Sequence, residues 1–406
     1  MSDYVLRTAT ETDLDALVRL RREAFANTGD PDPDSTRRLV FEAERNHLFE
    51  HDGQVVAAAA IFTRDLAIPG AVIPAAHVTG VAVSAVHTRR GLLRRLMTEQ
   101  LRTAPEAVAV LWASEGRLYG RYGYGMAAQN VAVRADRREL EITATPAGGR
   151  LRDGVPSELL KELSEVYSSV LPTKPGWSSR NETWWRHLTS DPEHDRGGGT
   201  KARAVLYENP DGAVEGYARY RIHPRWDDTG PKMEVGVIEV VAGTPAAYAE
   251  LYRFLLRIDL ARTLSQGLTS ADDPLFHLVN EPAALGGHTQ DGLWVRIRDL
   301  PRALTARTFA APVDVVFEVT DELLPDNAGR WRLQARAGGS LVNCTRSDGE
   351  PDFTLGIAEL GAAYLGGTRL GALHLAGRVH EHRPGAVAAA STAFGWPIAP
   401  YGIEIF

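Results

Sequence analysis

The fold of this chain is decided by one stretch, Val78-Thr79-Gly80-Val81-Ala82-Val83, followed by His87-Thr88-Arg89-Arg90-Gly91-Leu92-Leu93-Arg94. The pattern predicts an apolar strand that runs through a short basic loop into a helix opening at a glycine. The first backbone N–H groups of a helix have no intrahelical partner and lie at the positive end of the helix dipole. Because glycine lets a phosphate approach the backbone, the stretch predicts a pyrophosphate site, to which Arg89, Arg90 and Arg94 add charge. A buried strand leading into an ordinary amphipathic helix is the alternative.

A second strand and a turn carrying a tyrosine come next. The apolar run Val108-Ala109-Val110-Leu111-Trp112-Ala113 is followed directly by Ser114-Glu115-Gly116-Arg117-Leu118-Tyr119-Gly120. The order of strand, basic glycine turn, helix, strand and short tyrosine-bearing helix resembles the core of the GNAT superfamily of N-acetyltransferases. The resemblance implies that the pyrophosphate of an acyl-coenzyme A lies on the glycine turn. It also implies that Tyr119 protonates the departing thiolate.

More of the chain resembles a narrower family. The segments 87–94 and 113–125, Asp273-Pro274-Leu275-Phe276-His277-Leu278, Asp291-Gly292-Leu293-Trp294-Val295-Arg296-Ile297 and the final phenylalanine are similar to the enhanced intracellular survival (Eis) acetyltransferases of actinobacteria. The similarity runs from the first strand to the last residue. It implies an α+β protein with tandem GNAT folds, the second degenerate, followed by a sterol-carrier-protein-like C-terminal domain.

Composition limits the class of protein. A chain of 406 residues predicts two or three domains, and 44% hydrophobic and 24% charged residues are ordinary for a globular protein. The longest apolar runs, such as Val55 to Phe62, are too short to span a bilayer, and the N-terminus has no basic-then-apolar leader. Cys344 is the single cysteine, which excludes a disulfide framework and a cysteine-based metal site. A cytoplasmic enzyme is the expectation, and leaderless secretion stays open.

Net charge bears on the partner. The formal charge of −7 argues against nucleic acid, whose phosphates need a basic face. The same charge would attract a cationic substrate, although many enzymes carry a similar charge for solubility alone.

The chain divides into three expected domains: a catalytic GNAT domain over 1–138, a degenerate GNAT-like domain over 139–298 and a sterol-carrier-like domain over 299–406. We expect Ala132 to Arg138 to close the first. The central strand of the second, Glu234 to Val241, leads to Thr244-Pro245 instead of a basic glycine turn. Because proline has no N–H and its ring fills the space of a phosphate, one working centre per chain is expected.

Acetyl transfer needs a polarised carbonyl and a held cofactor. Backbone N–H groups of Val81, Ala82 and Val83 would polarise the carbonyl if the strand is splayed from its neighbour, and ordinary core is the alternative for these residues. The expected cofactor set adds Arg89, Arg90, Gly91, Leu92, Leu93 and Arg94, with Ser114 and Glu115 from the resemblance. An N-cap serine and a dipole-favoured glutamate are the alternatives for the last two.

The transfer also needs an acid and a base. Tyr119 is the expected general acid, and only the resemblance separates it from Tyr122 and Tyr124. The resemblance further makes the terminal carboxylate of Phe406 the general base on the acceptor amine. An α-carboxyl has a pKa of about 3.5, so a useful base needs burial or an acidic neighbour such as Glu404. The apolar run from Trp396 to Tyr401 predicts a buried tail.

This sequence departs from the family at several positions. Thr88 and Leu93 stand at the first and last positions of the usual Arg/Gln-x-x-Gly-x-Gly/Ala turn, and Arg89 or Arg90 would compensate for the missing first side chain. A first set of residues stands where better-known members of the family line the acceptor pocket with aromatic and acidic side chains. A second set, of acidic residues, offers candidate partners for a substrate ammonium group. For the aspartates of the second set, a loop that is simply solvated is the alternative. The first set is Asn27, Thr36 and Gly80, and the second is Asp30, Asp32, Asp34 and Glu404.

The expected activity is transfer of acetyl from acetyl-coenzyme A, as co-substrate, to primary amines of a small polycationic molecule. By resemblance the acceptors are aminoglycosides, acetylated at one or several positions, and the assembly is a homohexamer. A protein-lysine or other amine acetyltransferase, or a non-enzymatic lipid- or partner-binding scaffold, is the alternative. His47, His51, His77 and His87 lack the i, i+4 carboxylate spacing of a metal site, so no metal is expected.

Overall fold

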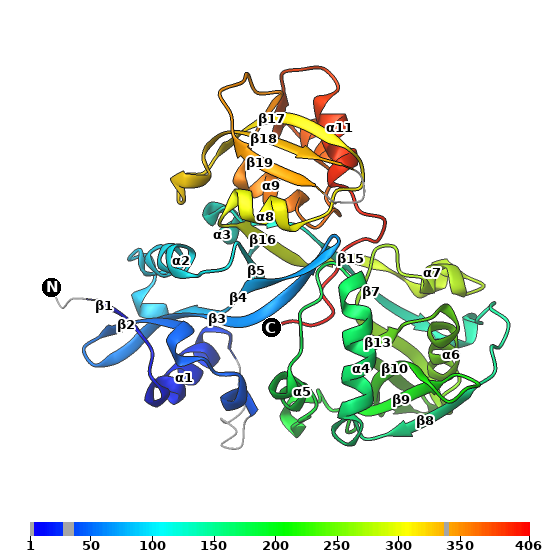
Figure 1. Cartoon of the computed structure of the whole chain (residues 1–406). Coiled ribbons are helices and arrows are strands. Elements are labelled where there is room, and N and C mark those ends of the chain that lie inside the picture. Colours follow the sequence, from blue (N-terminus) through cyan, green and yellow to red (C-terminus); the bar gives the residue numbers. More distant parts are fainter. Residues whose placement is uncertain (1–3, 27–35, 337–340) are drawn as a thin grey trace. The chain divides into compact units, whose positions relative to one another are not determined.

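The computed structural model describes residues 4–26, 36–336 and 341–406. By compactness it divides into two units. The first holds 1–128, 291–397 and 405–406, and the second holds 129–290 and 398–404. Each unit is built around a central sheet, and the first carries an additional smaller one (Figure 1).

The main sheet of the first unit contains the predicted strand–loop–helix stretch, and its long paired strands β3 and β4 are blue in Figure 1. In spatial order its strands are β1 (Val5–Thr8), β2 (Asn46–His51), β3 (Gln54–Ile68), β4 (Ala71–Val83), β5 (Val108–Trp112), β16 (Leu293–Ile297) and β6 (Gly125–Met126). Its helices are α1 (Leu14–Ala24), α2 (Leu92–Thr103) and α3 (Gly116–Tyr119). Leu14, Leu17 and Leu20 bury one face of α1 at helical spacing.

The sheet of the second unit repeats this plan. In spatial order its strands are β15 (His288–Asp291), β7 (Gln129–Asp136), β14 (Ala261–Thr269), β13 (Met233–Ala242), β10 (Val214–His223), β9 (Arg203–Glu208) and β8 (Arg150–Gly154). The helices are α4 (Leu160–Val170), α5 (Glu182–Leu188), α6 (Pro245–Leu256) and α7 (Leu275–Leu278), and β11 (Trp226–Asp227) with β12 (Gly230–Pro231) form a separate hairpin. As in the first sheet, the central strand is antiparallel to one neighbour, β10, and parallel to the other, β14.

Two strands belong to the other sheet from the one that we expected from the sequence. We expected Ala132 to Arg138 to close the first domain, but β7 pairs with β14 of the second sheet. Conversely, β16, which the sequence analysis assigned to the second domain, pairs along the whole of β5 in the first sheet. Both strands are largely buried, and each has an apolar stretch, Val131 to Val133 in β7 and Leu293 to Val295 in β16. The hydrophobic pattern therefore predicts that these segments are strands, but it does not predict in which sheet each strand pairs.

The third expected domain shares the core of the first unit. Its strands in order are β19 (Val342–Arg346), β18 (Gly329–Ala335), β17 (Val313–Thr320), β20 (Phe353–Gly356) and β21 (Val379–Glu381). Its helices are α8 (Leu300–Ala306), α9 (Ile357–Ala363), α10 (Leu370–Leu375) and α11 (Ala386–Phe394). A Cβ on Gly361 of α9 would lie 2.4 Å from the Val295 carbonyl oxygen, so this glycine lets the helix lie directly on β16. The buried ion pair between Arg296 and Asp321 (2.7 Å) lies in the same contact.

Candidate active site

Strand β4 carries a bulge at Gly80. The register with β3 pairs Ala58 with Ala82 and then Ala60 with Thr79, so two residues of β4, Gly80 and Val81, stand opposite one residue of β3. Gly80 has φ +58°, in the left-handed region that glycine adopts without steric cost. A strand bulged in this way bends and changes the direction of its backbone amides.

The guanidinium of Arg21 braces the bulge. Arg21 Nε donates to the Gly80 carbonyl oxygen (3.2 Å) and its Nη2 donates to Asn46 Oδ1 (2.7 Å). A Cβ on Gly80 would lie 2.5 Å from Arg21 Nε, so residue 80 must be glycine for this contact to exist. Burial lowers the pKa of Arg21 to about 10, which leaves it charged at neutral pH. Gly80, expected from its position to line an acceptor pocket, thus has a backbone role.

Strands β4 and β5 separate beyond the bulge. Over the described residues their parallel pairing is confined to Ala76 with Ala109 and His77 with Val110, although β4 continues to Val83. In an antiparallel pair, alternate residues direct their N–H groups away from the partner strand. Between the bulge and Val83, amides directed away from β3 therefore have no β5 partner. This is the splayed geometry that the sequence analysis required of residues 81–83.

The basic loop leads into α2 with two left-handed residues, Arg89 (φ +59°) and Gly91 (φ +77°). Gly91 is the N-cap of α2, and a Cβ there would meet no heavy atom within 4 Å, so the helix start faces open space. The amides of the first turn have no acceptor within the helix. The loop and helix start thus form the exposed donor set that the sequence predicts.

The side chains of this stretch divide between the core and solvent. Leu92 is buried and Leu93 half-buried, so only their backbone can contribute to a ligand site. Arg90 Nη2 donates to the Val86 carbonyl (3.4 Å), whereas no hydrogen bond of the Arg89 side chain is found among the described residues. The hydroxyl of Thr88 donates to the Ala85 carbonyl (3.0 Å) within the loop. Of the two arginines expected to compensate for Thr88, Arg89 is therefore the more available.

Tyr119 lies at the end of α3, close to Ser114. The phenol is buried, and its ring is 6.1 Å from that of Tyr124. Burial raises the pKa of Tyr119 above its ordinary value of 10, and a hydrogen bond with the Ser114 side chain opposes the rise. Tyr119 is therefore protonated at neutral pH, as a general acid must be. The N-cap of α3 is Glu115, so the N-cap alternative for Ser114 is not what the structure shows.

Burial does not separate Tyr119 from its rivals. Tyr122 and Tyr124 are also buried and belong to the same core cluster. Burial raises the pKa of Tyr124 further, and its hydroxyl has no hydrogen-bond partner among the described residues. The contact with Ser114 is the feature that distinguishes Tyr119.

The C-terminal phenylalanine is packed within the first unit. The Phe406 ring lies 4.8 Å from the ring of His77, a fully buried residue of β4. Burial and the charge of Arg64 lower the pKa of His77 to about 3, so it is neutral at physiological pH. In the second unit, Glu404 forms an ion pair with Arg180 (2.6 Å). Its charge is therefore largely compensated, which weakens its expected role as the acidic neighbour of the terminal carboxylate.

The second sheet lacks the open helix start of the first. The Thr244 hydroxyl accepts from the Ala247 amide (3.2 Å) and donates to Glu215 (2.8 Å), and Pro245 occupies the first helical position of α6. The helix start is capped, as Thr244-Pro245 predicts, and the cap and the proline leave little for a phosphate to bind, so a degenerate second site stays a prediction.

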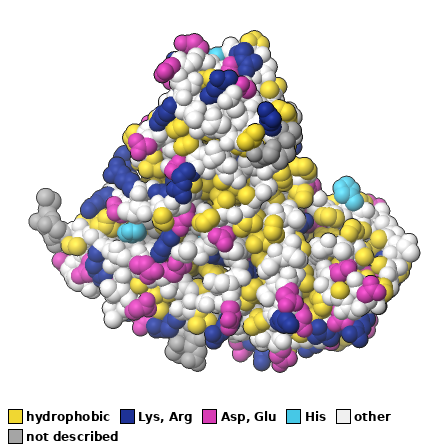
Figure 2. Space-filling view, viewed as in Figure 1, with side chains coloured by type: hydrophobic (Ala, Val, Ile, Leu, Met, Phe, Trp, Pro, Cys, Tyr) yellow, Lys and Arg dark blue, Asp and Glu magenta, His cyan; other side chains and the backbone are white. Residues whose placement is uncertain are grey.

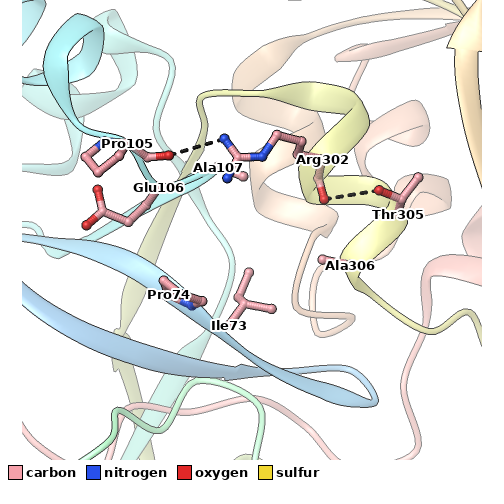
Figure 3. A pocket seen from close by; sticks show the side chains of 8 residues that line it. All are labelled: Ile73, Pro74, Pro105, Glu106, Ala107, Arg302, Thr305 and Ala306. Carbon is pink, nitrogen blue, oxygen red and sulfur yellow. Dashed lines mark hydrogen bonds between the residues drawn. The ribbon is translucent and has the colours of Figure 1, made fainter.

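A separate hollow of about 500 Å³ lies in the first unit (Figure 3). It is lined by Ile73, Pro74, Pro105, Glu106, Ala107, Arg302, Thr305 and Ala306, none of which is a predicted site residue. Several of its polar groups are engaged, since Arg302 donates to the Pro105 carbonyl (3.2 Å) and Arg45 donates to Glu106 Oε1 (2.7 Å). Nothing in its chemistry connects it with acetyl transfer.

Some of the residues and sites considered in the sequence lie outside the site described above. Asn27, Asp30, Asp32 and Asp34 fall outside the described residues. Within the part that is described, no cluster of three or more metal-ligating side chains occurs, and no helix is long and apolar enough to cross a membrane. On the face drawn in Figure 2, acidic and basic side chains are interspersed.

Comparison with known proteins finds matches along nearly the whole chain. The family description "Acetyltransferase (GNAT) domain" matches residues 5–127 and again 176–297, and "Sterol carrier protein domain" matches 300–402. An uncharacterized N-acetyltransferase of Streptomyces avermitilis is 41% identical over 85% of each chain. The N-acetyltransferase Eis of Mycobacterium bovis is 32% identical over 91% of each chain. The crystal structure of Eis1 from Mycobacterium abscessus superposes with a TM-score of 0.83 at 30% identity, covering 99% of this chain and 100% of that one.

Proposed function

Because the chain belongs to the Eis family of GNAT N-acetyltransferases, we propose that it transfers acetyl from acetyl-coenzyme A to primary amines of a polycationic small molecule, aminoglycosides first among them. The observation that carries the proposal is the bulged strand β4, splayed from β5 and continued into the open, glycine-capped start of α2. Tyr119 and Phe406 belong to the same compact unit. A scaffold without activity has no need of this arrangement.

We assign the pyrophosphate and the thioester of acetyl-coenzyme A to separate parts of the first unit. The amides of Gly91 to Arg94, with the side chains of Arg89, Arg90 and Arg94, would hold the pyrophosphate. Amides of residues 81–83 that have no β5 partner would donate to the thioester carbonyl and stabilise the negative charge that develops on it. Ser114 and Glu115 are exposed beside the end of β5 and would border the cofactor.

In the proposed reaction the neutral amine attacks the acetyl carbonyl carbon, an N–C bond forms, and the C–S bond breaks. The thiolate takes the phenol proton of Tyr119, and the new ammonium gives a proton to the terminal carboxylate of Phe406. A thiol has a reference pKa of about 8.5, and burial raises the pKa of Tyr119 above 10. Full proton transfer is therefore uphill unless the proton moves as the C–S bond breaks. The site would thus retain the proton until charge develops on sulfur.

The acceptor class rests on the resemblance and on charge. A chain with a net charge of −7 attracts a polycation over a long range, and an aminoglycoside offers several primary amines at once. Acetylation at several positions and assembly as a homohexamer are carried over from the family as part of the proposal. Lysine side chains and other amines are the second acceptor class.

The test is release of coenzyme A thiol from acetyl-coenzyme A in the presence of aminoglycosides, polyamines or lysine peptides, with binding of acetyl-coenzyme A measured separately. Release with an aminoglycoside and mass increments of whole acetyl groups on the drug would support the proposal. Release with lysine peptides alone would replace the acceptor class. Tight binding without release across the panel would reject all three classes.

A further inference from the structure

A buried charge network occupies the second unit. Arg180 donates through Nη1 and Nη2 to the carboxylate of Glu239 (3.1 and 2.7 Å), and Arg219 Nη1 donates to the same carboxylate (3.2 Å). Arg180 Nε donates to Glu404 Oε2 (2.7 Å), from the C-terminal tail. The guanidinium lies 4.1 Å from the ring centroid of Tyr167, and its side chain is 1% exposed. Two arginines thus share two carboxylates in a site closed to water.

This network lies next to a break in the register of strand β13. Strand β13 is the counterpart of β4, since each is antiparallel to one neighbour and parallel to the other. The register of β13 with β10 also breaks, from Arg219 with Glu239 to Tyr220 with Val237. The residue left without a partner at this break is Ile238, and Glu239 stands next to it, whereas Gly80 and Val81 stand at the break in the first sheet. The charge network of the second unit therefore adjoins the break in β13, where Arg180 and Arg219 both donate to Glu239.

The backbone of the C-terminal tail, residues 398–404, also forms hydrogen bonds with the rest of the second unit. Asn130 Nδ2 donates to the Gly402 carbonyl (2.7 Å), and the Gly402 amide donates back to Asn130 Oδ1 (3.4 Å). The Tyr401 amide donates to the Pro175 carbonyl (3.2 Å), and the Ala399 amide donates to Asp272 Oδ2 (2.7 Å). Chain termini are ordinarily frayed unless they are tied down. These bonds tie down the tail from several separate segments.

We propose that the second unit is an anchor for the C-terminal tail, in which Arg180 and Asn130 are positioning residues that hold Glu404 and Gly402 and so limit the motion of the terminal carboxylate that follows them. The inference rests on the proposed role of that carboxylate as general base. Phe406 follows Glu404 by two residues, and two residues of chain span at most about 7 Å. Holding Glu404 therefore confines the carboxylate to a small volume. A general base misplaced by about 1 Å can lose about 100-fold in rate.

The first experiment measures the tail directly. Carboxypeptidase A, which removes a C-terminal phenylalanine, is added to the folded protein, and loss of Phe406 is followed by mass spectrometry. Cleavage reports the population of the detached tail when opening is fast. Glu404→Gln removes the negative charge but keeps the side-chain shape and an acceptor oxygen, so a charge-assisted hydrogen bond becomes an ordinary one and Phe406 should be released about 10-fold faster. Glu404→Arg, which repels Arg180, should release it faster still.

The second experiment measures kcat and the KM for acetyl-coenzyme A on the same variants. We expect kcat to fall about 10-fold or more for Glu404→Gln while this KM stays within about two-fold, because a misplaced base affects the chemical step. Asp272→Ala, at an exposed residue that accepts from Ala399, is a second variant with no buried charge at risk.

A matched control exists in the same unit. Arg152 is also shared by two carboxylates, those of Glu162 and Glu208, and among the described residues no hydrogen bond or ion pair joins these three side chains to residues 398–404. Glu162→Gln should leave both the release of Phe406 and kcat unchanged.

The outcomes separate the two hypotheses. Faster release with a lower kcat supports the anchor. Release no faster than in the unaltered protein overturns the anchor, whatever happens to kcat. Faster release with unchanged kcat leaves the anchor standing and rejects the carboxylate as the base.

Discussion

The substitution Gly80→Ala tests how the bulge in β4 is maintained. An alanine at φ +58° takes the left-handed conformation, which costs about 1–2 kcal/mol for a residue with a Cβ. Its Cβ would also lie 2.5 Å from Arg21 Nε and 2.7 Å from Cζ. The guanidinium must then leave the Gly80 carbonyl. Losing a hydrogen bond from a charged group costs about 1.5–3 kcal/mol.

Gly53→Ala is the matched control. Gly53 has φ +75° in the turn between β2 and β3, and a Cβ there would meet nothing within 4 Å. Both variants carry the backbone strain, and Gly80→Ala alone carries the collision. The difference between them should be about 2 kcal/mol, which corresponds to about 4–8 °C in Tm for a unit of this size. Affinity for acetyl-coenzyme A should fall about 10-fold in Gly80→Ala, since about 1.4 kcal/mol of lost amide geometry suffices.

The assay is thermal unfolding of the protein together with titration of acetyl-coenzyme A. The double variant Gly80→Ala with Arg21→Ala removes the group that collides, so its loss of stability should be smaller than the sum of the single losses. Equal Tm shifts for Gly80→Ala and Gly53→Ala, or an additive double variant, would refute the argument that Arg21 braces the bulge.

Three further predictions concern the acid, the base and a buried histidine. Tyr119→Phe should lower kcat about 100-fold and leave acetyl-coenzyme A binding near normal, and unchanged turnover would exclude Tyr119 as the general acid. Because burial raises the pKa of Tyr119, the phenol of the unaltered enzyme should stay protonated beyond pH 10. Two glycines added after Phe406 should abolish activity at unchanged Tm, because the terminal carboxylate becomes a peptide group; an active extended enzyme would exclude the carboxylate role. Burial lowers the pKa of His77 to about 3 in the folded protein, whereas the pKa in the unfolded chain is about 6.5. Between these pH values the unfolded chain binds more protons than the folded protein does. The contribution of neutral His77 to the free energy of unfolding is therefore complete above pH 6.5 and should be about 2 kcal/mol lower at pH 5. His77→Gln should lose this part of the pH dependence in urea unfolding at pH 8 and pH 5, and an identical dependence would show that His77 titrates normally.

The parts of the fold that local chemistry determines could be predicted from the sequence. The glycine and arginines after β4 indicated an open helix start, and the structure has Gly91 as the N-cap there. Thr244-Pro245 indicated a closed helix start, and the Thr244 hydroxyl caps α6. Each of these features depends on a few adjacent residues, whose backbone preferences act wherever the segment lies in the fold.

Pairings across the chain could not be predicted in the same way. The hydrophobic pattern of β7 and β16 fits either sheet, and only the completed fold shows that β16 covers β5. The contact of Arg180 with Glu404 joins residues 224 positions apart. For Arg21 there was a partial signal: it follows Leu17 by four residues and so lies on the buried face of α1. A single sequence gives no indication that its partner is the Gly80 carbonyl.

The central strands of the two sheets both break register, and different residues surround the two breaks. In β4 the bulge holds a glycine, and the nearby arginine donates to its carbonyl, so no side chain of residue 80 enters the opening beside β5. In β13 the break leaves Ile238 unpaired, and its neighbour Glu239 carries a buried carboxylate that must be paired, which brings in Arg180 and Arg219. Once these charges are in place, Glu404 adds a second carboxylate that balances the second arginine. Because Glu239 and Glu404 together balance two buried arginines, Glu239→Ala leaves a buried positive charge without a carboxylate, and this variant should disrupt the network that holds the tail and release Phe406 faster.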